Sequence, residues 1–181
     1  MSLSSELPPN LTARAQQIKA IVLDVDGVLT DGRIVYDELG DELKCFDVQD
    51  GTGLVLWRRV GGLSAIITAR KSRMVKRRAK EMQVNFLAQK ALHKLSAYEK
   101  FLRRTRLTQE QVCVVADDLM ELPLMRRAGL AVAVSNAVQE IKSASHYVTL
   151  HAGGRGAVRE VVDLLIKSKG LWENALERYV V

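Results

Sequence analysis

The chain has 181 residues, of which 48% are hydrophobic and 27% are charged, and its formal net charge is +6. This composition is typical of a soluble globular protein, and the length suits a single compact domain over residues 1–181. No apolar run is long enough to cross a bilayer, and residues 1–10 lack the pattern of a secretory signal. We therefore expect a cytoplasmic protein with no membrane partner.

The positive charge allows an anionic partner without identifying one. Basic residues are densest over 70–80, where helical spacing predicts a solvated face. Aromatic residues are not interleaved with them, so we expect no nucleic-acid partner. The two cysteines are far apart and the three histidines lack zinc-ligand spacing, so we expect neither a reactive thiol pair nor a zinc site.

Short apolar runs alternate with helical patterns, which predicts an α/β domain with a central parallel sheet. Continuous apolar runs are typical of strands covered on both faces. The predicted strands are Ala20–Val25, Leu63–Thr68, Val112–Ala116 and Leu130–Val134, with Val84–Phe86 and Tyr147–Thr149 as weaker candidates. The predicted helices are Gly53–Arg59, Ser72–Met82, Lys94–Thr105, Leu122–Ala128, Ala137–Ser143 and Gly156–Lys169. Asn136 and Gln139 resemble a capping pair for one of these helices.

Residues 33–46 interrupt the alternation of strands and helices. Arg33–Tyr36 and Glu42–Phe46 flank the turn-forming sequence Asp-Glu-Leu-Gly-Asp. This pattern predicts a small β-hairpin insertion in place of a helical crossover. Residues 170–181 are mixed in character and are predicted to form a docked C-terminal tail.

The segment Asp24–Gly32 directly follows the first buried strand. Parallel sheets bind ligands at the carboxyl ends of their strands, so Asp24 and Asp26 lie where an active site is expected. One carboxylate can attack phosphorus while the other handles the proton of the leaving alcohol. An Asp-Gly pair alone is also typical of a polar turn.

Later strand ends add groups that suit a phosphate. Thr68 ends its strand and can donate a hydrogen bond to a phosphoryl oxygen, with Arg70 nearby to add charge. Lys94 opens a helix, where a cation is unexpected for helix stability but useful beside an anion. Taken alone, Thr68 is more often a helix cap and Lys94 a surface residue.

Carboxylates also gather after the strand Val112–Ala116, at Asp117, Asp118 and Glu121. Magnesium prefers oxygen ligands, and these carboxylates together with Asp24 could hold one ion between them. Acidic residues also favour a helix N-terminus without any metal. The ordered set of Asp-x-Asp, Thr, Lys and Asp-Asp at successive strand ends is nevertheless specific.

This set resembles the haloacid-dehalogenase phosphatase superfamily, and in particular its capless branch that contains 3-deoxy-D-manno-octulosonate 8-phosphate phosphatase. The resemblance covers about residues 20–169, with matching segments at Asp24–Gly32, Phe46–Gly51, Ile66–Lys71 and Gly153–Glu160. It implies a Rossmann-like three-layer sandwich without a large cap domain. It also implies a Mg²⁺-dependent phosphomonoesterase acting on a phosphorylated sugar acid in lipopolysaccharide biosynthesis.

The resemblance also implies a role for each matching residue. Asp24 would form an aspartyl-phosphate intermediate, and Asp26 would protonate the leaving oxygen and later activate water. Magnesium would be held by the carboxylates of Asp24 and Asp117 and by the backbone carbonyl of Asp26. Thr68 and Lys94 would hold the phosphoryl group.

Supporting and substrate-binding roles follow from the same resemblance. Asp118 would orient Lys94, and Glu121 would support the site from a position where the family usually has aspartate. The residues implied to contact substrate are Asp26, Asp50, Gly51, Arg70 and Arg78. Members of the family are typically homotetramers whose hairpins associate centrally, and a neighbour's glycine-rich C-terminal segment helps to enclose each site.

Departures from the family pattern keep several alternatives open. Ala116 replaces a glycine, and Gln49 and Val55 stand where the family has arginines that would contact an anionic sugar acid. Another substrate, such as a sialic-acid-like 9-phosphate, is one alternative, and a non-catalytic interaction module is another. A signalling receiver domain is disfavoured, because its phosphorylated aspartate follows a later strand.

Overall fold

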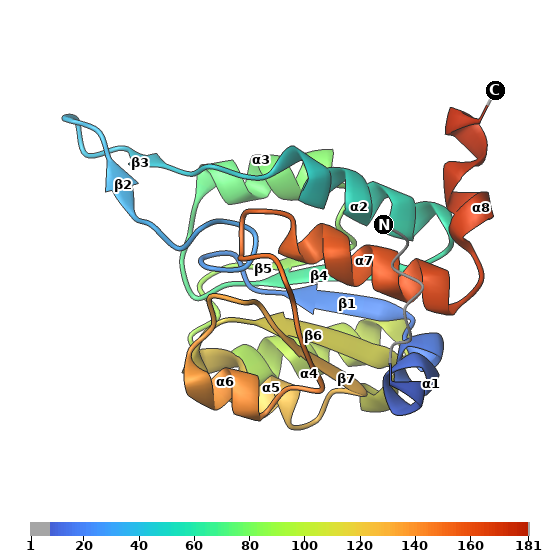
Figure 1. Ribbon diagram of the computed structural model, residues 1–181. Helices are drawn as coiled ribbons and strands as arrows, with labels where there is room; N and C mark the ends of the chain where they lie inside the picture. Colours follow the sequence, from blue (N-terminus) through green and yellow to red (C-terminus); the bar gives the residue numbers. More distant parts are fainter. Residues whose placement is uncertain (1–7, 181) are drawn as a thin grey trace.

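Six parallel strands form the central sheet of residues 8–180, the part of the chain that the computed structural model describes (Figure 1). Their order is β5-β4-β1-β6-β7-β8. The strands are β1 (Ala20–Leu23), β4 (Leu63–Ile67), β5 (Phe86–Ala88), β6 (Val112–Ala116), β7 (Leu130–Ala133) and β8 (Tyr147–Val148). The chain runs from β1 to one side of the sheet and later returns to the other, so β1 and β6 lie at a topological switch point, where open α/β sheets bind ligands.

Helices cover both faces of this sheet. In Figure 1, α2, α3 and α7 lie on one face and α4, α5 and α6 on the other. The helices are α1 (Pro9–Gln17), α2 (Val48–Arg59), α3 (Arg73–Glu81), α4 (Lys94–Thr105), α5 (Leu122–Met125), α6 (Gln139–Ser143), α7 (Ala157–Ser168) and α8 (Trp172–Leu176). The predicted three-layer α/β fold is confirmed. Within residues 8–180, no helix is long and apolar enough to span a membrane.

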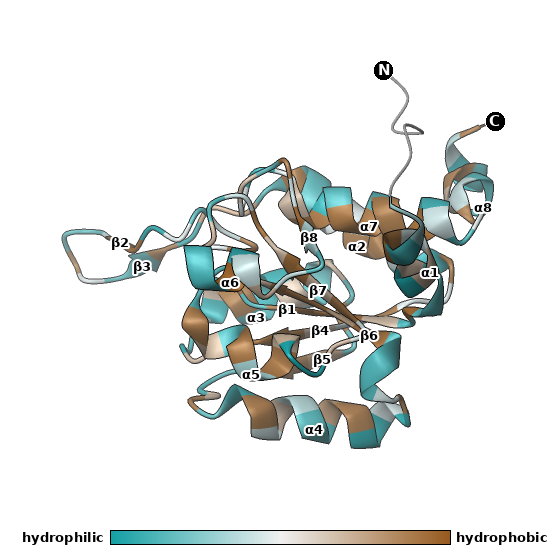
Figure 2. Ribbon diagram, turned by 60° about the horizontal axis from the view of Figure 1, so that its bottom comes forward, coloured by the Kyte–Doolittle hydropathy of each residue, from teal (hydrophilic) through white to brown (hydrophobic). Residues whose placement is uncertain are grey.

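The core lies between the sheet and the two helical layers. Every residue of β1, β6 and β7 is buried, and Figure 2 shows these strands as mainly hydrophobic ribbon between the helices. Strands covered on both faces have no solvent-facing side, which explains their continuous apolar sequences. The resulting frame holds the carboxyl ends of the strands rigidly at one edge.

Several helix boundaries differ from the prediction for local reasons. The structure adds α1, which begins at Pro9, a favoured first helical position, and buries Leu11 and Ala15. Helix α2 begins five residues earlier than predicted, because the side chain of Asp47 accepts hydrogen bonds from the first-turn N–H groups of α2. The Asn136 capping prediction is wrong: α6 begins at Gln139 with no side-chain cap.

The predicted hairpin is present as β2 (Val35–Tyr36) paired antiparallel with β3 (Glu42–Leu43). It projects beyond the carboxyl-terminal edge of the sheet (Figure 1). Asp37 closes its turn by accepting hydrogen bonds from the backbone N–H groups of Leu39 and Asp41. In the predicted tail, α8 packs against α2 and α7. Residues 1–7 and 181 of the predicted domain lie outside the described residues.

Candidate active site

A pocket of about 180 Å³ opens where the carboxyl ends of β1, β4 and β6 meet. Its lining consists of Ala69, Met120 and eight of the predicted site residues: Asp24, Asp26, Thr68, Arg70, Lys94, Asp117, Asp118 and Glu121. The parallel sheet thus brings together side chains that are spread over about a hundred residues of sequence. Asp24 lies at the switch point, directly after β1.

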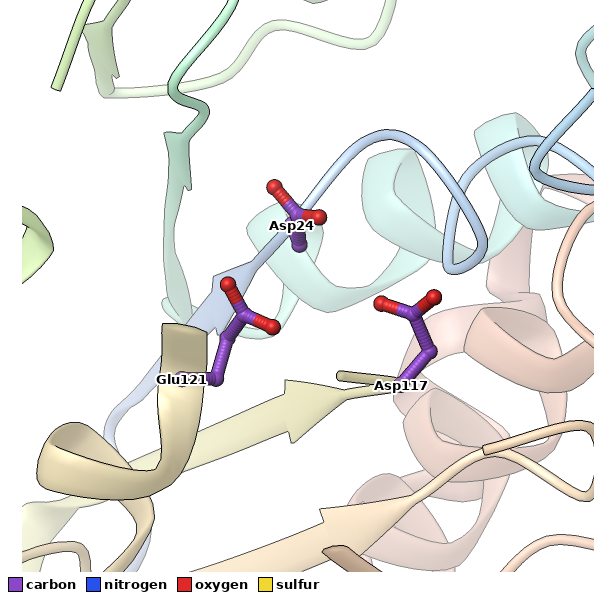
Figure 3. Close-up of side chains that lie close together, drawn as sticks. All are labelled: Asp24, Asp117 and Glu121. Atoms are coloured by element: carbon purple, nitrogen blue, oxygen red, sulfur yellow. The ribbon is translucent and has the colours of Figure 1, made fainter. Parts of the chain in front are cut away.

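Three carboxylates form the floor of this site. Asp24, Asp117 and Glu121 each offer an oxygen, and these three atoms lie within 4.8 Å of one another. Figure 3 shows the carboxylates converging from the end of β1, the end of β6 and the helical turn that follows β6. Oδ1 of Asp117 and Oε2 of Glu121 are buried without a hydrogen-bond partner. Buried oxygens without donors are costly, and oxygen ligands are what Mg²⁺ prefers, so this cluster fits a divalent cation.

The protonation of these carboxylates reflects their crowding. Burial, followed by the charge of Asp24, raises the pKa of Asp117 to about 7. The same two causes raise the pKa of Glu121 to about 7. Burial also raises the pKa of Asp24, although Lys94 opposes it. A cation among the three groups would remove this repulsion and favour their ionised forms.

Gly27 allows Asp117 to lie this close to the loop that follows β1. Its φ is +92°, and a β-carbon built on it would lie 1.9 Å from Oδ2 of Asp117. Any larger residue would therefore displace the carboxylate as well as strain the backbone. The glycine of the Asp-x-Asp-Gly motif is explained by this contact.

Lys94 lies at the start of α4 and is buried in the site. Its Nζ donates to Oδ1 of Asp24 at 2.7 Å and also to Oε1 of Glu121. Burial alone would lower the pKa of Lys94, but the charges of Asp24 and Glu121 outweigh it and raise the pKa. Lys94 therefore stays charged beside Asp24.

The expectation that Asp118 orients Lys94 is not met in the structure. The carboxylate of Asp118 instead accepts from the backbone N–H of Leu119 at 2.7 Å, which caps the short 3₁₀ helix Leu119–Glu121. Glu121 takes the place beside Lys94. It lies one helical turn further on, where its longer side chain reaches into the site.

Thr68 and Asp26 both contact Arg70. Thr68 is buried at the end of β4, and its Oγ1 accepts from the backbone N–H of Arg70 at 3.3 Å. Asp26 is contacted by two cations: Lys44 lies 2.5 Å from its Oδ1, and Nε of Arg70 lies 3.8 Å from its Oδ2. Lys44 was missed by the sequence reasoning. The available signal was alternation along the hairpin, which places residues 42 and 44 on one face.

Three predicted substrate contacts lie away from this pocket within the described chain. Asp50 lies in the first turn of α2 and is buried against the N-terminus of α7. Its Oδ1 accepts a hydrogen bond from the backbone N–H of Arg159 at 2.8 Å. Burial raises its pKa to about 6. Gly51 packs against the guanidinium of Arg78, which donates to the backbone carbonyl of Asp47 at 2.9 Å. These residues connect α2 to α3 and α7 and do not line the pocket.

The glycine-rich segment 153–156 closes over the loop after β1 in the same chain. The N–H of Gly154 donates to the carbonyl of Val28 at 2.9 Å, and a β-carbon on Gly153 would lie 1.7 Å from the carbonyl oxygen of Gly27. Asn136 connects the two loops, accepting from the N–H of Gly153 at 2.7 Å and donating to the carbonyl of Gly27 at 3.3 Å. The family resemblance implied that the glycine-rich segment of a neighbouring chain helps to enclose each site. In this chain the segment supports its own site.

Residues 63–161 match the family of haloacid dehalogenase-like hydrolases. The 3-deoxy-D-manno-octulosonate 8-phosphate phosphatase of Escherichia coli strain K12 is 41% identical over 166 residues, covering 92% of this chain and 88% of that protein. The chain belongs to the haloacid dehalogenase-like hydrolase family. The predicted family membership is confirmed.

Solved structures of relatives agree with this assignment. The 3-deoxy-D-manno-octulosonate 8-phosphate phosphatase from Yersinia pestis superposes with a TM-score of 0.91 at 38% identity, covering 92% of this chain and 90% of that one. The same phosphatase from Moraxella catarrhalis, in complex with magnesium ion, phosphate ion and a KDO molecule, gives a TM-score of 0.90 at 37% identity, covering 93% of this chain and 97% of that one. The chain therefore shares its fold with phosphatases of this family, one of which was solved with magnesium bound.

Proposed function

We propose that this chain is a phosphomonoesterase that hydrolyses 3-deoxy-D-manno-octulosonate 8-phosphate to the free sugar acid and phosphate. The observation that carries this proposal is the placement of the Asp24 carboxylate beside charged Lys94 and the Asp117–Glu121 carboxylates at the switch point. Relatives named for this activity cover nearly the whole chain. Magnesium is the proposed cofactor, held by Asp24, Asp117 and the backbone carbonyl of Asp26, with Glu121 in reach of the same ion.

The proposed first step transfers the phosphoryl group to Asp24. A carboxylate oxygen of Asp24 forms a bond to phosphorus while the bond from phosphorus to the sugar oxygen breaks, and the carboxyl of Asp26 gives its proton to that oxygen. Thr68 and Lys94, whose side chains are both buried, hold the phosphoryl oxygens, and Lys94 balances their charge. Bound magnesium would supply further positive charge to the transferring group.

The proposed second step releases phosphate. Asp26 accepts a proton from water as the water oxygen bonds to phosphorus, and the bond to Asp24 breaks. This returns Asp24 as a carboxylate and Asp26 as a carboxylic acid, so no proton is left unaccounted for. The same residue thus acts as acid in one step and as base in the next.

Arg70 is the proposed contact for the anionic sugar acid, because it is the cation at the rim of the pocket and its side chain is 36% exposed. Asp50, Gly51 and Arg78 would have to contact substrate bound at another chain's site, since they lie off the pocket of their own chain. Gln49 and Val55, which replace family arginines, also lie on α2 outside the pocket lining. The replacement of these two arginines therefore leaves the residues around Asp24 unchanged and concerns only which substrate is bound.

The decisive experiment measures phosphate release from 3-deoxy-D-manno-octulosonate 8-phosphate with and without magnesium, beside a panel of sugar phosphates that includes a sialic acid 9-phosphate. We expect magnesium-dependent release with the octulosonate ester preferred. Preference for another ester would reassign the substrate, and no release from any ester would favour an interaction module. Asp24→Asn is the control, because it keeps the shape of the residue and removes the nucleophile.

We also propose a homotetramer in the cytoplasm. The hairpin carries exposed apolar side chains, among them Tyr36 at 60% and Leu39 at 90% exposure. Several exposed apolar side chains on one short hairpin are consistent with an interaction site. Light scattering of the wild type and of a Tyr36→Ser, Leu39→Ser variant tests this: a tetramer that dissociates in the variant supports association through the hairpin.

A further inference from the structure

Lys44 reaches from the base of the hairpin into the site without lining its pocket. Its Nζ lies 2.5 Å from Oδ1 of Asp26 and 3.2 Å from Oε1 of Glu42, and its side chain is 1% exposed. An ammonium removed from water is costly unless it is paired and hydrogen-bonded. Lys44 is therefore held in place between two carboxylates, and Asp26 is one of them.

Arg70 completes a four-membered charge network around Asp26. It contacts the other carboxylate oxygen, Oδ2, at 3.8 Å and also pairs with Glu42. The two cations differ in access: Arg70 lines the pocket and is 36% exposed, whereas Lys44 is closed off behind Asp26. A ligand in the pocket would therefore meet Arg70, whereas Lys44 does not line the pocket.

We propose that Lys44 is the positioning residue of Asp26. It donates to Oδ1, which confines the transferable proton of the carboxyl group to Oδ2, on the side where Arg70 lines the pocket. This inference rests on the proposed function, in which Asp26 gives its proton to the leaving oxygen. Its consequence is that the hairpin, through Lys44, is part of the acid–base machinery.

The test compares two esters that differ in their need for a proton. The sugar acid leaves phosphorus as an alkoxide unless its bridging oxygen is protonated, whereas p-nitrophenyl phosphate releases a stable phenolate anion. General acid–base catalysis contributes about 10²- to 10⁴-fold, and misplacing Asp26 should remove part of it. For Lys44→Met we expect kcat/KM to fall by roughly 10- to 100-fold on the sugar ester and by less than about 3-fold on p-nitrophenyl phosphate. Using kcat/KM limits the comparison to the steps from substrate binding up to departure of the leaving group, and excludes hydrolysis of the phosphorylated Asp24.

Four further variants separate positioning from a structural role. Lys44→Arg keeps the charge and should restore much of the sugar-ester activity. Asp26→Asn should show the same difference between esters, and adding Lys44→Met to it should cause little further loss, since both act through one group. Lys100→Met, on the exposed surface of α4, is the matched control and should match the wild type. Thermal unfolding of each variant reports whether it is folded.

The outcomes are distinguishable. Equal losses on the two esters, or a full additional loss from Lys44→Met in the Asp26→Asn background, would show that Lys44 acts on structure alone and would overturn the inference. A wild type that releases phosphate from neither ester would instead defeat the proposed function, and the inference with it. Activity of the wild type with an unaffected Lys44→Met variant would overturn the inference and leave the proposed function standing.

Discussion

Gly27 and Asp117 are in such close contact that a β-carbon on the glycine would lie 1.9 Å from Oδ2 of the aspartate. The two residues lie on different loops, one after β1 and one after β6. Their contact allows the Asp117 carboxylate to lie close to the loop that carries Asp24 and Asp26. The sequence motif Asp-x-Asp-Gly therefore carries two separate requirements. The aspartates supply chemistry, and the glycine leaves room for a carboxylate from the neighbouring strand.

We predict that Gly27→Ala lowers magnesium affinity and phosphatase activity in addition to the loss of stability caused by backbone strain. A non-glycine residue at φ +92° costs about 1 to 3 kcal/mol of stability, and the new methyl group would also displace Asp117. Gly61→Ala is a matched control, with φ +86° and nothing within 4 Å of the added carbon. Both variants should lose stability in denaturant unfolding, but Gly27→Ala alone should lose magnesium affinity and phosphatase activity. Equal activities in the two variants would contradict the proposed role of the contact.

Asn136 supports a second prediction, because its side chain joins Gly153 to Gly27. Asn136→Ala leaves two backbone groups without partners in a partly buried position, which costs about 1 to 3 kcal/mol. Asn136→Asp keeps the acceptor for the N–H of Gly153, so it should retain most of the stability. Unfolding free energies of the three proteins check this order. A stability for Asn136→Ala equal to that of the wild type would mean that the glycine-rich segment is held by other contacts.

The fold and the centre of the site could be predicted because they depend on local sequence. The apolar runs of β1 and β6 indicate doubly covered strands, and parallel strands bring their carboxyl ends to one edge, which places Asp24 near Asp117. Helix α1 was not predicted from the sequence, because it is stabilised by packing against α7 and not by a strong helical pattern of its own.

The contacts that the sequence did not predict join segments far apart in the chain. Lys44 meets Asp26 across 18 residues, and Asn136 meets Gly153 across 17. The local sequence suggests an ordinary role for each of these side chains: a surface lysine in a hairpin for Lys44 and a helix cap for Asn136. Only the folded arrangement shows which partner a polar side chain reaches, and the same holds for Asp50 of α2, which bonds to the first turn of α7.

Asp50 provides a prediction about pH. Its folded-state pKa of about 6 lies above the usual value of 3.8, so the folded protein binds this proton more tightly than the unfolded chain does. The contribution of Asp50 to stability is therefore greatest below about pH 4 and is lost as the pH rises through about 6. Asp50→Asn keeps an acceptor oxygen for Arg159 and does not titrate. The difference in unfolding free energy between wild type and Asp50→Asn should shift against the wild type from pH 4 to pH 7, as measured by urea unfolding at each pH. A difference that stays constant across this range would show that Asp50 titrates normally.

Magnesium should stabilise the protein more at pH 8 than at pH 6. Asp117 and Glu121 both have pKa values raised to about 7 by burial and by Asp24, and only their ionised forms bind a cation well. At pH 6 the ion must displace protons, whereas at pH 8 both carboxylates are already ionised. Saturating magnesium, at about 100 times its Kd, adds about 2.7 kcal/mol to the unfolding free energy, which thermal unfolding detects as a higher Tm. Asp117→Asn should abolish the magnesium-dependent rise at both pH values, and Glu121→Gln should reduce it and weaken its pH dependence. A rise in Tm that is equal at pH 6 and pH 8 would place magnesium away from these two carboxylates.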